Sequence, residues 1–353
     1  MALTRRGRLI AVVITTVVVV GAVVGVVVAA GKGGRGPLAS GSGGPSTTPG
    51  SSPSQSPPPS VCPLTDLPPQ GDRVPNQPAL AVKVENLPSV RPQTGLSHAD
   101  IIYEEPVEAG ITRFIVVYQC TGSDRIEPIR SGRLTDPDIL RQFGHPLFAY
   151  AGGVPQVESK VRQAGLIDVN FVRAAKAYHR DPNKPQPHNL YSSTKELYSS
   201  ASWDPVPPKP VFVYSKKARG TKTHEIHLPF SSSSDVFWKW SKSMDAWLRF
   251  HGDVPHTYSD GTQVNAKNVV VQVVKVIQTG ITDVNGVPSP EVVATGTGKA
   301  YVLRNGKMIT GTWSRPKLGD ITRFFDKKGR EIGLDPGNTW VELFPSTLTV
   351  TAS

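Results

Sequence analysis

The sequence predicts a membrane-attached protein of the α+β or α/β class, with an N-terminal α/β domain followed by a β-rich C-terminal domain. Three observations predict this: a long apolar segment near the N-terminus, a stretch of Gly, Ser and Pro after it, and a change from mixed signals to strand signals near residue 205. The 353 residues exceed the usual size of one domain. We therefore divide the chain into residues 1–30, 31–60, 61–205 and 206–353.

Residues 1–30 indicate a single transmembrane helix. Residues 9–30 carry no charge, and a membrane-spanning helix needs about 20 apolar residues. Arg5, Arg6 and Arg8 precede this run, so the N-terminus should stay in the cytoplasm and the rest should lie outside the cell membrane. Cleavage after Ala30 would instead give a secreted form. We favour the uncleaved anchor, because the apolar run is longer than that of an ordinary signal peptide.

Residues 31–60 are almost entirely Gly, Ser, Pro and Thr, which predicts a disordered linker. The net charge of +11 includes five basic residues, and no acid, among the first sixty residues. The remainder of the chain therefore has an excess of only +6, and its basic runs lack interleaved aromatic residues. This composition argues against nucleic-acid binding.

The chain has two cysteines, Cys62 and Cys120, and this topology would place both of them outside the cytoplasm. Thiols outside the cytoplasm are usually oxidised, so the pair is expected to form one disulfide bond. Two unpaired buried thiols are the alternative.

Residues 61–205 carry alternating strand and helix signals. Strands are predicted at residues 79–86, 99–105 and 110–120, the last two as an antiparallel pair, and at 146–153. Helices are predicted at 135–144 and at 154–166, where Gly165 is a stop signal. The second helix follows Gly152-Gly153, an arrangement that exposes backbone amides at a helix N-terminus to a ligand.

Residues 206–353 carry strand signals with intervening turns, of which Asn305-Gly306 is the clearest. We expect no helix here apart from a turn near 236–242. The predicted strand runs are 209–215, 223–231, 245–252, 267–280, 298–313, 321–334 and 339–350.

Several segments resemble the YerB-like family of exported bacterial proteins, a two-domain family of unknown function. They are VRPQTGL, ADIIYEEPVEAGITRF, EPIRSGR, AYAGG and PHNLYSS in the N-terminal domain, and KNVVVQ, RNGKMITGTW and DPGNTWVELFP in the C-terminal domain. The resemblance spans about residues 65–350 and implies an extracytoplasmic location without implying an activity. Many members are lipoproteins; this chain has no cysteine close after its apolar run, so its anchor is expected to be the helix itself.

The candidate ligand-binding residues are arginines and their neighbours in these segments. Planar guanidinium groups match the oxygens of carboxylates and phosphates, so several arginines beside a Gly-Gly helix start could form an anion pocket. The set is Arg91, Gln93, Arg113, Arg130, Ser131, Arg133, Gly152, Gly153, His188 and Asn189. Internal ion pairing of the arginines, a turn-stabilising role for Asn189 and simple packing of His188 are the alternatives.

Arg113 is the centre of this hypothesis. Its strand neighbours are core-forming residues, so its guanidinium should be partly buried and should need an acidic partner. We predict that Arg113 contacts Glu104 or Glu105. We also predict that Arg130 or Arg133 reaches the same cluster, beside Gly152-Gly153 and His188.

Two functions follow from these residues. The first is a non-catalytic envelope protein that binds an anionic ligand, such as a cell-wall polymer, a peptide carboxylate or an envelope protein. The alternative is a hydrolase of an envelope glycan or phosphodiester polymer, with Glu104, Glu105 or Glu108 as the acid and His188 assisting. No cofactor motif is present, and His224 and His227 lack the spacing of a zinc site, so we expect neither cofactor nor metal.

Overall fold

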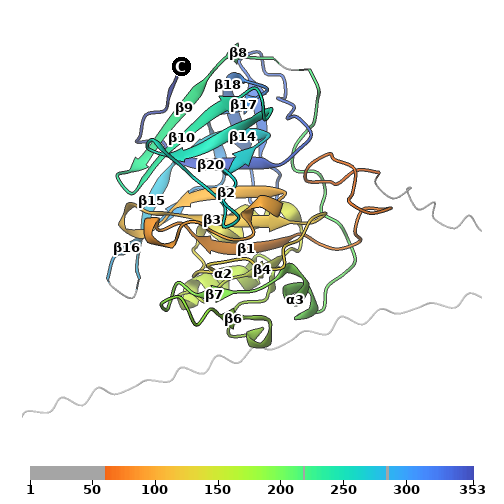
Figure 1. Ribbon diagram of the computed structural model, residues 1–353, viewed down its shortest axis with the longest axis vertical. Helices are drawn as coiled ribbons and strands as arrows, with labels where there is room; N and C mark the ends of the chain where they lie inside the picture. The colour runs from red at the N-terminus through yellow and green to blue at the C-terminus, as the bar shows by residue number, and fades with distance from the viewer. Residues whose placement is uncertain (1–59, 218, 284–285) are drawn as a thin grey trace, which may run out of the picture. The chain divides into compact units, whose positions relative to one another are not determined.

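Strands from both predicted domains combine into one mixed sheet in the computed structural model, which describes residues 60–217, 219–283 and 286–353 (Figure 1). Within those residues the sheet has eleven strands. From edge to edge they are β19 (Arg323–Asp326), β18 (Lys307–Arg315), β17 (Gly296–Arg304), β14 (Asn268–Val274), β20 (Thr339–Pro345), β2 (Ile101–Pro106), β3 (Thr112–Tyr118), β1 (Leu80–Glu85), β4 (Leu147–Ala149) and β5 (Ile167–Asp168), with β8 (Thr221–Lys222) paired to β18.

The two halves of the sequence meet in the middle of this sheet, where β2 runs parallel to β20. Residues 101–104 pair in register with residues 339–342, and β20 is in turn parallel to β14. The orange β2 and the blue β20 lie side by side in Figure 1. The change of pattern near residue 205 therefore divides the sequence, while one sheet spans both parts.

Three smaller sheets complete the β structure of the described residues. The largest has six strands, in the order β12 (Val254–Pro255), β11 (Ala246–His251), β10 (Ser234–Ser241), β9 (Glu225–Ser231) and β21 (Thr351–Ala352), with β13 (Asn265–Ala266) paired to β11. The two-stranded sheets are β15 (Val276–Thr282) with β16 (Pro288–Val292), and β6 (His179–Arg180) with β7 (Leu190–Tyr191).

Helices are few in the part of the chain that is described. The two predicted helices are confirmed as α1 (Thr135–Leu140), which continues into a 3-10 turn, and α2 (Pro155–Gln163). Gly165 has a positive φ of 70°, the left-handed conformation that commonly ends a helix. A third short helix, α3 (Thr194–Ser199), was not predicted; Ser193 caps it by accepting a hydrogen bond from the Glu196 amide.

Two local predictions are wrong. Residues 236–242 were expected to hold a turn, but residues 236–241 lie within β10. Residues 209–215 were expected to form a strand, but they contain only an isolated bridge at Tyr214. Pro210 and the prolines before it explain this, because proline has no N–H to donate to a ladder.

Strand alternation divides the side chains of the long sheet between two cores. On β1, Val84 faces a core that includes Trp238 of the six-stranded sheet, and Ala81 faces a core shared with α1 and α2. Lys83 and Glu85 continue the second face, where both side chains are buried. Charged groups are therefore built into this face, and they require partners.

No helix among the described residues is both long enough and apolar enough to cross a bilayer. The predicted span at residues 9–30 and the predicted linker up to residue 59 lie outside those residues.

Candidate functional site: an arginine-lined cavity

A cavity of about 300 Å³ opens on the face of the long sheet that carries α1 and α2. One wall comes from residues 130–134 and 151–154, together with Glu108 and Arg113. The facing wall comes from the β15–β16 hairpin, through residues 281–283 and Ser289. Both halves of the sequence therefore contribute to one site.

Backbone hydrogen bonds fix the segment that carries two of the arginines. The Arg130 amide donates to the Lys83 carbonyl (2.9 Å), and the Arg130 carbonyl accepts from the Ala151 amide (2.9 Å). The Gly132 amide donates to the carbonyl of Gly152 (2.9 Å). Residues 130–132 thus lie between β1 and the chain leaving β4, which places Arg130 and Arg133 beside the two glycines.

The third arginine, Arg113, reaches the cavity from β3. It pairs across the sheet with Glu85 on β1 and with Glu105 on β2, so the three residues form one row. Its side chain is 6% exposed. Its Nη1 donates to the Ser131 carbonyl (2.9 Å), whereas its Nε is buried and has no hydrogen-bond partner among the described residues.

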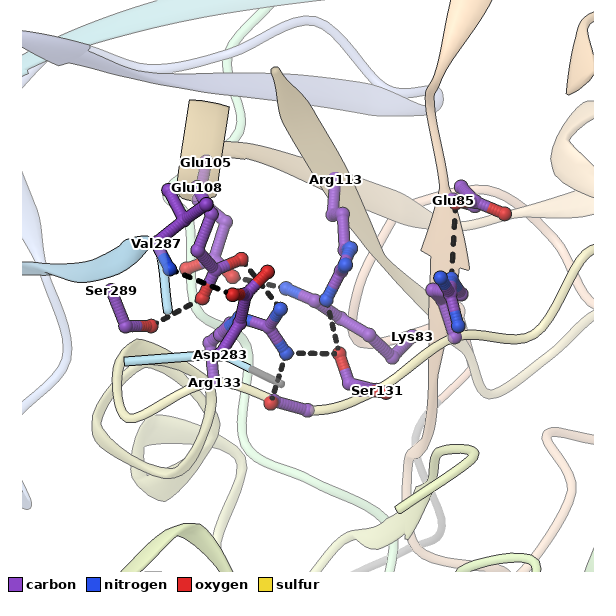
Figure 2. A network of polar contacts seen from close by, with 12 residues as sticks. Lys83, Glu85, Glu105, Glu108, Arg113, Ser131, Arg133, Asp283, Val287 and Ser289 are labelled. Atoms are coloured by element: carbon purple, nitrogen blue, oxygen red, sulfur yellow. Dashed lines mark hydrogen bonds and ion pairs between the residues drawn. The ribbon is translucent and has the colours of Figure 1, made fainter. Parts of the chain in front are cut away.

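The other two arginines are each held by a carboxylate. Arg133 Nη2 pairs with Glu108 Oε2 (2.5 Å), and the Ser289 hydroxyl donates to the other oxygen of Glu108. Arg130 Nε pairs with Glu85 Oε1 at 3.0 Å. Figure 2 shows Arg113 and Arg133 both reaching the Ser131 carbonyl. Arg113 alone of these three lacks an ion-pair partner within the described part of the chain.

The pKa shifts reflect this unequal pairing. Burial is the main cause that lowers the pKa of Arg113 to about 10, and the positive charge of Arg133 lowers it further. Burial alone would raise the pKa of Glu108, but the hydrogen bond and charge of Arg133, with the Ser289 hydroxyl, bring it below its ordinary value. Glu108 is therefore a carboxylate at neutral pH, and Arg113 is a buried cation that feels the charges of Glu108 and Glu85 but forms no direct ion pair among the described residues.

The predicted contact of Arg113 with Glu104 or Glu105 is wrong. Glu105 is bound by Lys83, which also contacts Asp136 at 2.7 Å. Glu104 points to the opposite face of β2, as strand alternation requires, and pairs there with Arg249 (2.5 Å). Arg130 or Arg133 was predicted to reach the same cluster as Arg113, beside Gly152-Gly153 and His188; both arginines line the cavity with Arg113 and the two glycines, whereas His188 does not.

Two predicted ligand-binding residues, Arg91 and Gln93, lie in a separate network on that opposite face. Arg91 binds Asn86, and Gln93 binds both Asn86 and the ring of His256 (2.8 Å). Arg249 donates to that ring (2.7 Å) and is itself fully buried. Burial first, and then the charge of Arg249, holds the pKa of His256 well below its usual value. This network joins β2 to the six-stranded sheet and does not line the cavity.

His188 and Asn189 lie beyond the cavity wall. His188 Nδ1 contacts Glu85 Oε2 (2.7 Å), so His188 is separated from Arg130 by one carboxylate. The side chain of Asn189 accepts a hydrogen bond from Arg180 (2.8 Å) and donates to the Asp181 carbonyl (3.0 Å). These bonds match the turn-stabilising alternative for Asn189.

The sequence analysis missed Glu85 as a partner and the whole hairpin wall. Turn signals between residues 280 and 290 indicate a hairpin there, but nothing local indicates which surface it covers. The cysteine prediction is confirmed by a Cys62–Cys120 disulfide bond. Among the described residues, no group of three His, Cys, Asp or Glu side chains is placed to hold a metal ion.

Comparison with known proteins assigns the chain to a protein family. Residues 64–205 match the model of the N-terminal domain of the protein family of unknown function DUF3048, and residues 226–341 match the model of its C-terminal domain. The chain therefore belongs to this two-domain family, and the resemblance drawn from the sequence is confirmed.

A relative is known from Bacillus subtilis (strain 168), under the name "Putative lipoprotein YerB". It is 24% identical over 285 residues, which cover 77% of this chain and 83% of the relative. The crystal structure of YerB protein from Bacillus subtilis superposes with a TM-score of 0.73 at 22% identity, covering 83% of this chain and 99% of that one. This likeness shows a shared fold.

Proposed function

We propose that the protein is a non-catalytic envelope protein, held outside the cell membrane by residues 9–30, and that its arginine-lined cavity binds an anionic envelope ligand or an acidic group of a partner protein. The observation that carries the proposal is Arg113, a guanidinium that is 6% exposed, lines the cavity and has no ion pair among the described residues. A buried charge without a partner is unfavourable, so an anion that entered the cavity would relieve it.

The proposed location has separate support. The Cys62–Cys120 disulfide fits an oxidising compartment. The name of the Bacillus subtilis relative is "Putative lipoprotein YerB", and lipoproteins are held at a membrane. The uncharged run at residues 9–30 would give this chain an equivalent attachment by a different chemical means.

The hydrolase alternative has less support. Glu104 and Glu105 are fully buried, bonded to Arg249 and Lys83, and do not line the cavity, and Glu108 is an ionised partner of Arg133. A general acid needs a proton to give, and the lowered pKa of Glu108 opposes that role. His188 binds Glu85 and does not line the cavity.

The test is anion binding by the purified full-length protein in a non-ionic detergent. Thermal unfolding is followed at constant ionic strength with acetate, dimethyl phosphate and inorganic phosphate. An anion present at ten times its Kd should stabilise the folded state by about 1.4 kcal/mol. The variant Arg113→Gln should lose this stabilisation, because it removes the unpaired charge.

Arg323→Gln is the matched control. Arg323 is 39% exposed, pairs with Glu331 and lies outside the cavity, so its loss should leave anion stabilisation unchanged. The proposal fails if no anion stabilises the wild type more than it stabilises Arg113→Gln.

A further inference from the structure

We propose, on the basis of the anion binding proposed above, that the cavity takes the free terminal carboxylate of a peptide whose last side chains are small and aliphatic. Four features of the cavity carry this inference: its charge, the geometry of its free donors, its backbone floor and its apolar walls.

The charge of the cavity favours a singly charged anion. Arg113 is the cation without a carboxylate partner, since Arg130 and Arg133 are already paired. Two acids, Glu108 and Asp283, also line the cavity and would repel a second negative charge. A carboxylate and a phosphodiester meet this condition at neutral pH, whereas a phosphate monoester does not.

The free edge of Arg113 matches a carboxylate. Its Nη1 is engaged by the Ser131 carbonyl, while Nε and Nη2 make no hydrogen bond within the described residues. Nε and Nη2 carry parallel N–H bonds on one edge of the planar guanidinium. Two carboxylate oxygens can accept both bonds at once, which is the bidentate geometry typical of arginine–carboxylate pairs.

The floor of the cavity lets a ligand approach the backbone. Gly152 has a φ of 128°, which a residue with a side chain rarely adopts, and Gly153 precedes the first turn of α2. No side chain caps the N-terminus of this nine-residue helix. Pro155 has no N–H, and the amides of Val157 and Glu158 donate to the Val154 carbonyl, so it is the helix dipole that adds a second favourable contribution for a negative charge beside Arg113.

The walls distinguish a peptide terminus from a sugar or polyol phosphate. Five aliphatic residues line the cavity: Leu134, Ala151, Val154, Val157 and Ile281. Hydroxyl groups placed against such walls would lose hydrogen bonds to water, whereas methyl and branched aliphatic side chains gain by burial. The volume of about 300 Å³ lies at the lower end of the range for ligand sites, which fits a chain end rather than the middle of a polymer.

The experiment compares matched probes by calorimetry on the full-length protein in detergent. The probes are acetyl-Ala-Ala with a free carboxylate, the same dipeptide as its terminal amide, and dimethyl phosphate, with the peptides in both L and D configurations. One configuration of the free acid should bind at least tenfold more tightly than its amide and than dimethyl phosphate. The ¹⁵N signal of Arg113 Nε, assigned by its absence in Arg113→Lys, should shift on addition of that acid.

Two variants test the geometry. Arg113→Lys keeps the charge and removes the planar pair of N–H donors, so it should weaken the binding of acetyl-Ala-Ala by about tenfold. Arg323→Lys is its control. Ile281→Ser should weaken the binding of acetyl-Ala-Ala by up to about tenfold and should weaken the binding of acetate less, because the peptide makes the larger contact with the apolar wall.

The outcomes separate this inference from the proposed function. If dimethyl phosphate binds more tightly than the free acid and Arg113→Gln abolishes that binding, the cavity is an anion site and the peptide inference is overturned. Equal binding of acid and amide also overturns it, since the carboxylate is then not recognised. If neither anion binds, both proposals fail.

Discussion

Replacing Arg113 with methionine should stabilise the ligand-free protein, although it removes a buried and hydrogen-bonded side chain. Burial brings the pKa of Arg113 from 12.5 to about 10, and this difference corresponds to about 3 kcal/mol of unfavourable free energy for holding the charge in the folded state. Methionine is unbranched and can follow the course of the arginine stem without carrying a charge.

The loss that opposes this gain is small. The hydrogen bond from Arg113 Nη1 to the Ser131 carbonyl contributes about 1 kcal/mol. That carbonyl keeps a hydrogen-bond donor in the variant, because Arg133 Nη1 also donates to it at 3.3 Å. The free energy of unfolding of Arg113→Met should therefore exceed that of the wild type by about 2 kcal/mol.

Urea unfolding, followed by tryptophan fluorescence in a buffer free of small carboxylates, measures this difference. Arg133→Met serves as the contrast, because Arg133 is paired with Glu108 in a site where both side chains are nearly buried. Its loss leaves a buried carboxylate without its cation and should destabilise the protein by about 3 kcal/mol. If Arg113→Met destabilises the protein as much as Arg133→Met does, Arg113 is satisfied in the free protein and the reasoning for an anion site is refuted.

Three further predictions concern pH, the disulfide and the membrane. Burial is the main cause that raises the pKa of Glu105 from 4.5 to about 7, with Lys83 opposing the shift and Asp136 adding to it, so between these pH values the folded state binds this proton more tightly than the unfolded state. Stability relative to Glu105→Gln should therefore be undiminished at pH 4 and should fall as the pH rises to 7, as urea unfolding at each pH would measure. Replacing Cys62 and Cys120 together with serine should cost about 4 kcal/mol for a loop of 58 residues; alkylation of the exported wild type before reduction should label neither thiol. Protease added to intact cells should release residues 61–353, and recovery of the whole chain from the cytosol would contradict the anchor at residues 9–30.

Local chemistry accounts for what the sequence predicted correctly. Gly165 as a helix stop and Asn305-Gly306 as the turn between β17 and β18 depend on backbone conformations that few residues adopt. The disulfide followed from the presence of only two cysteines and an inferred compartment. The convergence of Arg113 with Gly152-Gly153 followed from a strand pair and a Gly-Gly helix start.

Tertiary pairing accounts for what the sequence could not predict. The parallel contact of β2 with β20 joins residues more than two hundred positions apart, and no local signal encodes it. Strand alternation could have shown that Glu104 and Glu105 face opposite ways, so that only Glu105 was available to Arg113. That Glu105 would pair with Lys83 instead depends on where Asp136 of α1 lies.

The distribution of ion pairs is the argument that most favours the proposed binding site over an internal ion-pair network. Four cations, Lys83, Arg113, Arg130 and Arg133, lie on the cavity-bearing face of the long sheet with the carboxylates Glu85, Glu105, Glu108 and Asp136, and Asp283 lines the same cavity. The acids are numerous enough to give each cation one, yet Lys83 contacts two acids and Arg113 forms no ion pair among the described residues. Glu105 is the residue opposite Arg113 across the β2–β3 ladder, so a partner stands close by in register. A network selected for stability alone would use it. The pairing of Glu105 with Lys83 leaves Arg113 without an ion pair and its Nε without a hydrogen-bond partner among the described residues, in a side chain that lines the cavity.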